Sequence, residues 1–207
     1  MNKPYIPRCG DVGFAGYEGG IVPASIGYYS TGKGESATKA HHQFQVLRYE
    51  RIIQALTRTG VIVELWPATK ERIEDHKGAH YIIFRPPQMN WRKMDAIDDA
   101  AEKIKGRFYG FLEIPLQAMD GRLRKMGLLS EKRSFFAYLG ALFPWTMICS
   151  GVGNYCLGKA WLMPKCSAYW PPDGTFDAVV RLGWEVVCVD EGGEVYWGLN
   201  TEKGVIE

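Results

Sequence analysis

Alternating polar and apolar residues predict strands in the first half of the chain. Over residues 41–46, His, Phe and Val alternate with His and two Gln, which is the two-residue period of a strand. A Thr59-Gly60 turn separates two apolar runs within residues 52–66, a pattern typical of a hairpin. Strands are therefore predicted at 41–46, 52–56, 61–66 and 80–85, and residues 10–14 predict a turn that leads into a short strand.

The period lengthens to three and four residues farther along the chain. Apolar residues recur at these steps over 91–104, with Asp and Lys between them, and predict an amphipathic helix. Residues 149–157 predict a second helix, for which Ser150 suits the start. A short helix over 21–26 and several short helices over 107–148 are also expected.

The end of the chain has a hairpin pattern. Two apolar runs, 184–189 and 195–199, flank Glu191-Gly192-Gly193. Strands, then helices, then a hairpin predict an α+β fold. We find no repeat or linker-like stretch, so residues 1–207 are expected to form a single domain.

Composition excludes several classes of protein. Of 207 residues, 46% are hydrophobic and 23% are charged, with 25 basic and 23 acidic residues, as in ordinary globular proteins. This charge balance gives no reason to expect a nucleic-acid partner. The segment 1–5 lacks the apolar run of a secretory signal, and no apolar stretch approaches the length of a transmembrane helix.

The five cysteines are odd in number and widely spaced, which argues against a disulfide framework or a zinc knuckle. Most are expected to be reduced and buried. Cys149 is the exception, because it comes at the start of a predicted helix and small residues follow it. The helix dipole at that position lowers the pKa of a thiol, and the backbone N–H groups could hold an oxyanion.

Histidine is the side chain best suited to deprotonate a thiol near neutral pH. His41 and His42 stand at the start of a predicted strand, so their side chains point to opposite faces. His42 shares its face with apolar residues and His41 shares its face with glutamines, which favours His41 as the base. His76 and His80 flank a turn and are expected at the surface.

Together these segments resemble the circularly permuted papain-like hydrolases, the permuted NlpC-like group that includes YiiX-like and lecithin:retinol acyltransferase-like proteins. In that group a Gly-Asp opens the first strand, a histidine heads a later strand, a Glu-Ala and a Gly-Val follow, one strand ends in Arg-Pro, and Cys-Ser begins the nucleophile helix. This sequence shows, in that order, Gly10-Asp11, Ala40-His41-His42, Gln54-Ala55, Gly60-Val61, Arg85-Pro86 and Cys149-Ser150. Tyr169-Trp170-Pro171-Pro172-Asp173 could match a Pro-containing segment after the helix.

The resemblance implies an antiparallel sheet packed against a nucleophile-bearing helix, with catalytic residues Cys149, His41 or His42, and Gln54. Two positions depart from the family pattern. The Ser or Asn before the histidine is replaced, which leaves the choice between His41 and His42 open. The third residue is Gln54 instead of Glu; an amide can orient an imidazole but adds no charge, and Glu64 is the charged alternative.

The resemblance also implies the reaction. The thiolate would attack an amide or ester carbonyl without any metal or organic cofactor. A cell-wall peptide is the first expected substrate, and an isopeptide or lipid acyl bond the second. A cytoplasmic protein or a phage product, carried in the virion or delivered by lysis, is expected. There are two alternatives. One is an acyltransferase that uses the same residues, and the other is a non-catalytic papain-fold module with a binding or structural role, for example in a phage particle.

Overall fold

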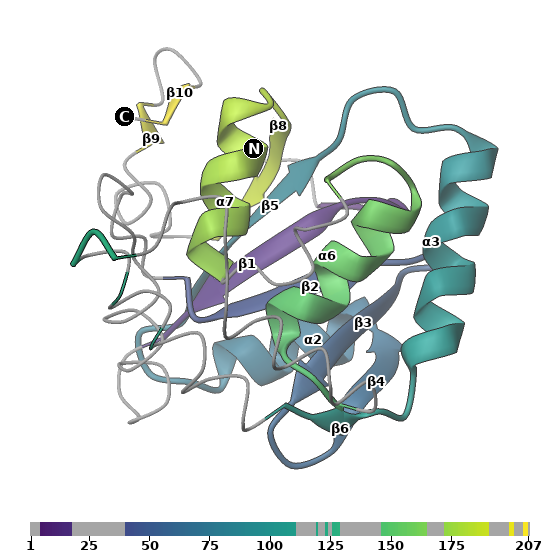
Figure 1. Cartoon of the computed structure of the whole chain (residues 1–207), viewed down its shortest axis with the longest axis horizontal. Helices are drawn as coiled ribbons and strands as arrows, with labels where there is room; N and C mark the ends of the chain where they lie inside the picture. Colours follow the sequence, from purple (N-terminus) through teal and green to yellow (C-terminus); the bar gives the residue numbers. More distant parts are fainter. Residues whose placement is uncertain are drawn as a thin grey trace.

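The computed structural model describes residues 5–17, 40–110, 119, 123, 126–128, 146–164, 172–190, 199–200 and 205–206. An antiparallel six-stranded sheet forms its centre, in the order β4-β3-β2-β1-β5-β8 (Figure 1). Its strands are β1 (Val12–Gly16), β2 (His42–Val46), β3 (Arg51–Leu56), β4 (Gly60–Leu65), β5 (His80–Arg85) and β8 (Glu185–Val189). The central position of β1 places the start of the chain between β2 and β5.

Helices lie against both faces of this sheet (Figure 1). They are α2 (Trp66–Glu74), α3 (Trp91–Ile104), α6 (Cys149–Lys159) and α7 (Pro172–Arg181). Two smaller pairs complete the described elements, β6 (Phe108–Tyr109) with β7 (Thr146–Met147) and β9 (Leu199–Asn200) with β10 (Val205–Ile206). The α+β class and the antiparallel sheet predicted from the sequence are therefore confirmed.

Strand β2 shows how the two faces of the sheet differ. On one face, Gln43 donates a hydrogen bond to Asn154 of α6 and lies against Gly153, where a Cβ atom would clash with its amide. On the other face, Phe44 packs with Trp66 of α2. We call these the α6 face and the α2 face.

Apolar side chains hold α6 on its face of the sheet. Ile53 of β3 and Ile97 of α3 belong to one buried cluster with Val152 of α6. Phe14 and Phe176 meet edge to face in the neighbouring cluster, with ring centroids 5.4 Å apart. Burying each such side chain contributes about 1.5–3 kcal/mol, so the contacts of Val152 hold the first part of α6 against β3 and α3.

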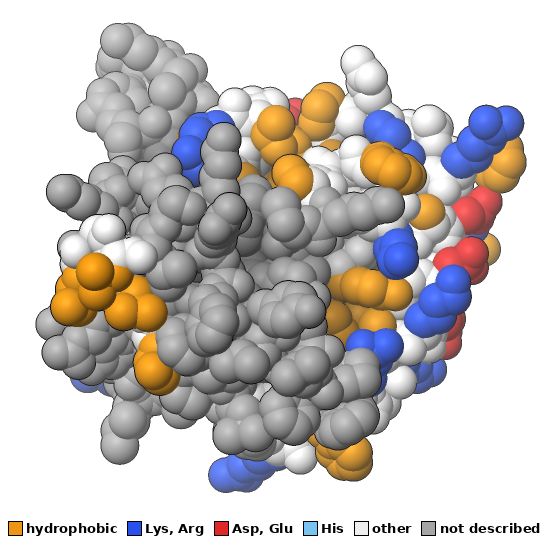
Figure 2. Space-filling model, viewed as in Figure 1, with side chains coloured by type: hydrophobic (Ala, Val, Ile, Leu, Met, Phe, Trp, Pro, Cys, Tyr) orange, Lys and Arg blue, Asp and Glu red, His pale blue; other side chains and the backbone are white. Residues whose placement is uncertain are grey.

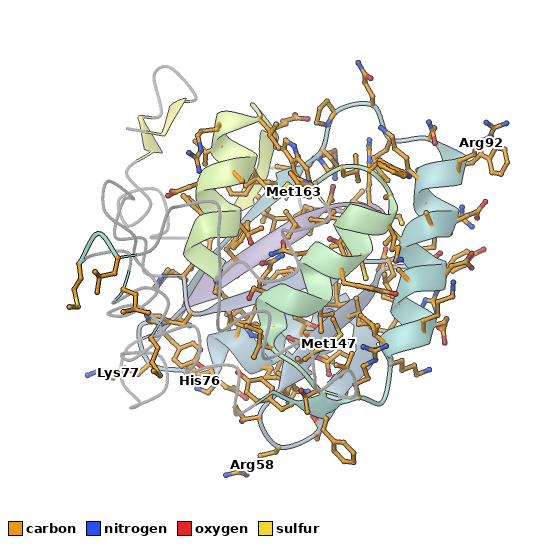
Figure 3. All side chains as sticks on the ribbon, viewed as in Figure 1. Arg58, His76, Lys77, Arg92, Met147 and Met163 are labelled. Carbon is orange, nitrogen blue, oxygen red and sulfur yellow. The ribbon has the colours of Figure 1, made fainter. Side chains whose placement is uncertain are left out.

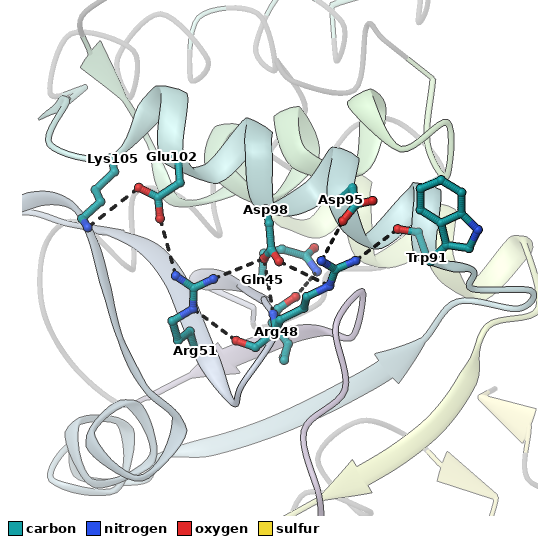
Figure 4. Close-up of polar contacts among 9 residues, drawn as sticks. Gln45, Arg48, Arg51, Trp91, Asp95, Asp98, Glu102 and Lys105 are labelled. Atoms are coloured by element: carbon teal, nitrogen blue, oxygen red, sulfur yellow. Dashed lines mark hydrogen bonds and ion pairs between the residues drawn. The ribbon is translucent and has the colours of Figure 1, made fainter.

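Charged side chains attach α3 to the sheet from outside (Figure 4). Arg48 pairs with Asp95 at 2.6 Å, and Arg51 reaches Asp98 and Glu102 at 3.7 and 3.5 Å. Blue and red side chains accordingly gather over α3 at the right of Figure 2. These groups are partly exposed, so each pair contributes on the order of 1 kcal/mol or less.

Several predicted elements agree with the structure and others do not. The short strand expected after the turn at 10–14, the strands at 41–46, 52–56 and 80–85 and the helices at 91–104 and 149–157 are confirmed, although the strand at 41–46 begins at His42. The strand predicted over 61–66 ends at Leu65, because Trp66 opens α2 with a proline at one of its first two positions. Helices α2 and α7 were not predicted.

The predicted C-terminal hairpin is confirmed in its first strand. That strand is β8, which pairs with β5, whereas residues 191–198 lie outside the described residues. The helix expected over 21–26 and most of the segment 107–148 also lie outside them. Within the described parts of the chain, no helix has the length and apolar character needed to cross a membrane.

Candidate functional site

Cys149 is the first residue of α6. The N-cap is Ile148, and the first helical hydrogen bond runs from the Val152 N–H to its carbonyl. Cys149 is 3% exposed, and its Sγ donates to the backbone carbonyl of His41 at an Sγ-to-O distance of 3.9 Å. The predicted place of Cys149 in the first turn of a helix is confirmed, and the expected contact of its sulfur with an imidazole nitrogen stays a prediction.

The start of α6 offers groups that could hold a negative charge. The first N–H groups of any helix have no partner within that helix, and the macrodipole is positive there. Ser150 and Gly151 are buried beside Cys149, and no described residue hydrogen-bonds to the Ser150 hydroxyl. An oxyanion formed next to the sulfur would meet these donors.

His41 approaches this helix from the start of β2. Its N–H donates to the Ala15 carbonyl of β1 at 2.9 Å, and its ring meets that of Tyr17 edge to face with centroids 6.0 Å apart. The backbone carbonyl of His41, which accepts from Cys149, places this residue at the start of α6. Its Nδ1 is buried, and no described residue hydrogen-bonds to it. Burial, and then the nearby His80, lower the pKa of His41.

His42 lies on the α2 face, where its side chain belongs to a network of hydrogen bonds and an ion pair. Its Nε2 is 2.7 Å from Gln54 Oε1, Gln54 Nε2 donates to Glu64, and Glu64 pairs with Arg72 at 2.7 Å. A carboxylate only accepts hydrogen bonds, so Glu64 fixes the orientation of the Gln54 amide. The amide oxygen of Gln54 therefore faces His42, whose Nε2 must carry the proton.

The charge state of His42 follows from the same surroundings. Burial lowers the pKa of His42, although the hydrogen bond to Gln54 and the charge of Glu64 act in the opposite direction. His42 is thus a neutral imidazole near neutral pH, held in one tautomer by Gln54.

The four predicted site residues consequently fall into two pairs. Cys149 and His41 meet on the α6 face, whereas His42 and Gln54 meet on the α2 face. Gln54 does hydrogen-bond to an imidazole, as predicted, but to that of His42. If His41 is the base, Gln54 is not its orienting residue.

Two histidines outside the predicted set stand at the same end of the sheet. His76 is exposed, as expected (Figure 3). Its ring stacks on that of Tyr17, with centroids 4.4 Å apart. The expectation that His80 is a surface residue is wrong, because it is 6% exposed. His80 is the first residue of β5 and shares its face with Ile82 and Phe84, an alternation that the sequence already contains.

The other described thiols are structural in character. Cys9 and Cys156 are buried and Cys188 is partly buried, and none forms a disulfide. Burial raises the pKa of Cys9 to about 12 and that of Cys188 to about 11, and it also raises the pKa of Cys156. Cys166 lies outside the described residues.

Among the residues that the structure describes, no three His, Cys, Asp or Glu side chains are grouped so as to hold a metal ion. Comparison with models of known protein families finds no match to this chain, and comparison with curated proteins finds no similar sequence. Arguments about function therefore depend on the site geometry and on the order of the short motifs.

Proposed function

We propose that this protein is a cysteine hydrolase that cleaves an amide or ester bond, with Cys149 as nucleophile and His41 as base. The observation that carries the proposal is the position of the Cys149 sulfur, at the first turn of α6 and 3.9 Å from the His41 carbonyl oxygen. A thiol in that position has the helix dipole, and a nearby imidazole is the second usual means of forming a thiolate, which we assign to His41.

The chemistry follows from these groups. His41 takes the thiol proton, and the thiolate adds to the substrate carbonyl, whose oxyanion faces the N–H groups at the start of α6. The His41 imidazolium then protonates the leaving amine or alcohol, and a thioester on Cys149 remains. His41 next deprotonates a water molecule, which attacks the thioester and releases a carboxylic acid and the thiol.

A permuted papain-like fold is part of the proposal, and one ion pair supports it. The Gly10-Asp11 and Arg85-Pro86 motifs are far apart in the sequence, yet Arg85 Nε and Nη2 contact the buried Asp11 carboxylate at 2.8 and 2.7 Å. Removing one partner of such a buried pair typically costs 3–5 kcal/mol. The ion pair thus joins two motifs of the resemblance and holds the start of β1 against the end of β5.

The proposed substrates are those that the resemblance implies: a cell-wall stem peptide first, and an isopeptide or lipid acyl bond second. An acyltransferase would use the same residues with another acceptor than water. The position of Gln54 favours a second candidate, a non-catalytic papain-fold module. Gln54 bonds to His42 on the face opposite Cys149, so the proposed base lacks the orienting residue that the family pattern implies.

Alkylation of Cys149 as a function of pH separates the two candidates. Iodoacetamide labelling, read at Cys149 by peptide mass spectrometry, is compared between the native chain and the chain unfolded in urea. An unperturbed thiol has a pKa near 8.5, so an activated Cys149 should react at least about tenfold faster at pH 6.5 in the native chain than in urea. Cys149→Ser provides the blank.

Cys156, on the same helix, is the internal control, because burial raises its pKa and it should react more slowly in the native chain than in urea. A native Cys149 that behaves like Cys156 would reject the hydrolase and favour the binding module. If Cys149 is activated, cleavage of stem peptides and acyl esters is then compared between the wild type and Cys149→Ser.

A further inference from the structure

Tyr17 is an aromatic residue beside the proposed base to which the proposed mechanism gives no role. It follows β1 directly, and it is partly buried. Its ring meets the His41 imidazole edge to face, with centroids 6.0 Å apart and planes at 75°. Aromatic rings prefer this arrangement at centroid distances of about 4.5–7 Å. The Tyr17 ring therefore forms one boundary of the space in which the His41 imidazole lies.

A second imidazole supports the Tyr17 ring. His76 stacks on it, with centroids 4.4 Å apart and planes inclined by 22°. His76 is held in the turn after α2, because its N–H donates to the Ile73 carbonyl and its own carbonyl accepts from the Ala79 N–H, at 3.1 Å in each case. The three rings thus join the end of β1, the start of β2 and the turn after α2.

The same segments lie close to the thiol. The His41 N–H donates to the Ala15 carbonyl of β1, and the His41 carbonyl accepts from the Cys149 Sγ. Burial, and then the charge of a Cys149 thiolate, raise the pKa of Tyr17, so the phenol of Tyr17 lies within electrostatic reach of the thiol. A side chain that contacts the His41 ring at this place can determine where the ring points.

We propose that Tyr17 is a positioning residue for His41: its ring, which stacks on His76, restrains the His41 imidazole in the orientation that faces the Cys149 thiol. The ring of Tyr17 carries this role, and its hydroxyl does not. One ring contact changes a conformational equilibrium by about two- to tenfold, so a similar factor is expected in the fraction of His41 that can accept the thiol proton. The catalytic part of this inference rests on the proposed function; the contacts among the three rings do not.

Two variants at position 17 separate the ring from the hydroxyl. Tyr17→Phe keeps the ring and should leave the rate of Cys149 alkylation at pH 6.5 within about twofold of the wild type. Tyr17→Leu keeps an apolar side chain without a ring, so this rate should fall by about three- to tenfold. At pH 9.5 most of an ordinary thiol is ionised without a base, and the rates of the wild type and both variants should agree within about twofold.

Tyr155→Leu is the matched control, because Tyr155 is also partly buried and lies on α6, where Lys159 Nζ is 5.2 Å from its ring centroid. Its alkylation rates should match those of the wild type at both pH values. The positioning role would be overturned by an equal fall in Tyr17→Phe or in Tyr155→Leu, by an equal fall of Tyr17→Leu at both pH values, or by wild-type reactivity in Tyr17→Leu. Far-ultraviolet circular dichroism checks that each variant has folded.

Nuclear Overhauser effects between ring protons test the contacts in the wild-type chain, without any variant and without thiol chemistry. We expect cross-peaks from the Tyr17 ring to the imidazole protons of both His41 and His76. If Cys149 is not activated, the proposed function fails together with the catalytic part of this inference, while these cross-peaks still decide whether Tyr17 holds His41. Absence of the cross-peak between Tyr17 and His41 would overturn that contact and the positioning role with it.

Discussion

His41 and His42 are neighbours in the sequence, and the sheet separates them into opposite environments. On the α2 face, His42 ends in a network of hydrogen bonds through Gln54 to Glu64. At the start of α6, the His41 carbonyl accepts from the Cys149 thiol, and the buried Nδ1 of His41 has no hydrogen-bond partner among the described residues. Within one dipeptide, the His42 imidazole therefore has a hydrogen bond to Gln54, whereas no described residue hydrogen-bonds to the Nδ1 of His41.

The difference indicates which histidine is suited to chemistry. An imidazole that must accept and release protons needs a nitrogen that is not committed to a permanent partner. Moving a proton at His42 would disturb an amide whose orientation is fixed by Glu64, whereas His41 has its carbonyl at the thiol and an Nδ1 to which no described residue hydrogen-bonds. A fully satisfied polar network, in contrast, contributes rigidity.

The largest expected effect comes from replacing each histidine by alanine. His41→Ala should slow the alkylation of Cys149 at pH 6.5 by about a hundredfold, which is typical of the loss of a general base. His42→Ala should leave this rate within about threefold, but lower the free energy of unfolding by about 1–3 kcal/mol, because it leaves the Gln54 oxygen without its donor. Urea denaturation measures the second quantity. Loss of reactivity in His42→Ala alone would reverse the assignment of the two faces.

A smaller effect is expected at Gln54. If this residue oriented the catalytic imidazole, Gln54→Glu would lower the pH at which Cys149 reacts. Because Gln54 lies on the α2 face and donates to Glu64, we expect an unchanged Cys149 profile and a loss of about 2 kcal/mol in stability near pH 7.

The sign of the pH dependence supports a sharper test. Burial and the charge of Glu64 would raise the pKa of the introduced carboxyl above its unfolded value, so the unfolding free energy of Gln54→Glu should recover as the pH falls toward 5. Gln54→Met introduces no carboxyl group, so its loss of unfolding free energy should not recover in this way as the pH falls. A Cys149 profile that moves to lower pH in Gln54→Glu would place residue 54 in the catalytic site.

Local patterns predicted much of the sheet and of the helix that carries the thiol. The alternation over 41–46 predicted the strand, which begins at His42, since a two-residue period is a property of the backbone. The opposite directions of the His41 and His42 side chains stay a prediction. Cys149 was placed at a helix start for the same kind of reason. Helix α2 was missed because its apolar face is short: Trp66 and Ile73 are its buried hydrophobic residues.

The site as a whole could not be predicted, because it depends on pairing between distant strands. Gln54 matches the order of the family motif, but the strand register puts it on the α2 face. The turn before His80 predicts a surface residue, whereas β5 enters the sheet beside β1 and buries His80. The strand order β2-β1-β5 determines which residues face each other, and no local period contains that order.

The smallest expected effect is a change in the pH dependence of stability at His42. Burial lowers the pKa of His42 below the value of about 6.5 that an unfolded histidine has. Between the two values the unfolded chain binds more protons, so stability is present above about pH 6.5 and is lost as the pH falls through the folded pKa. His41 contributes in the same direction, because its pKa is lowered too.

His42→Gln should therefore show a smaller loss of unfolding free energy between pH 7.5 and pH 5 than the wild type. The part of the pH dependence that remains in His42→Gln is expected to come from His41, so His41→Gln should remove that part. Urea denaturation at several pH values measures both. A His42→Gln slope equal to that of the wild type would mean that His42 becomes charged in the folded chain as readily as in the unfolded one, and that the two faces of β2 differ less than their hydrogen bonds indicate.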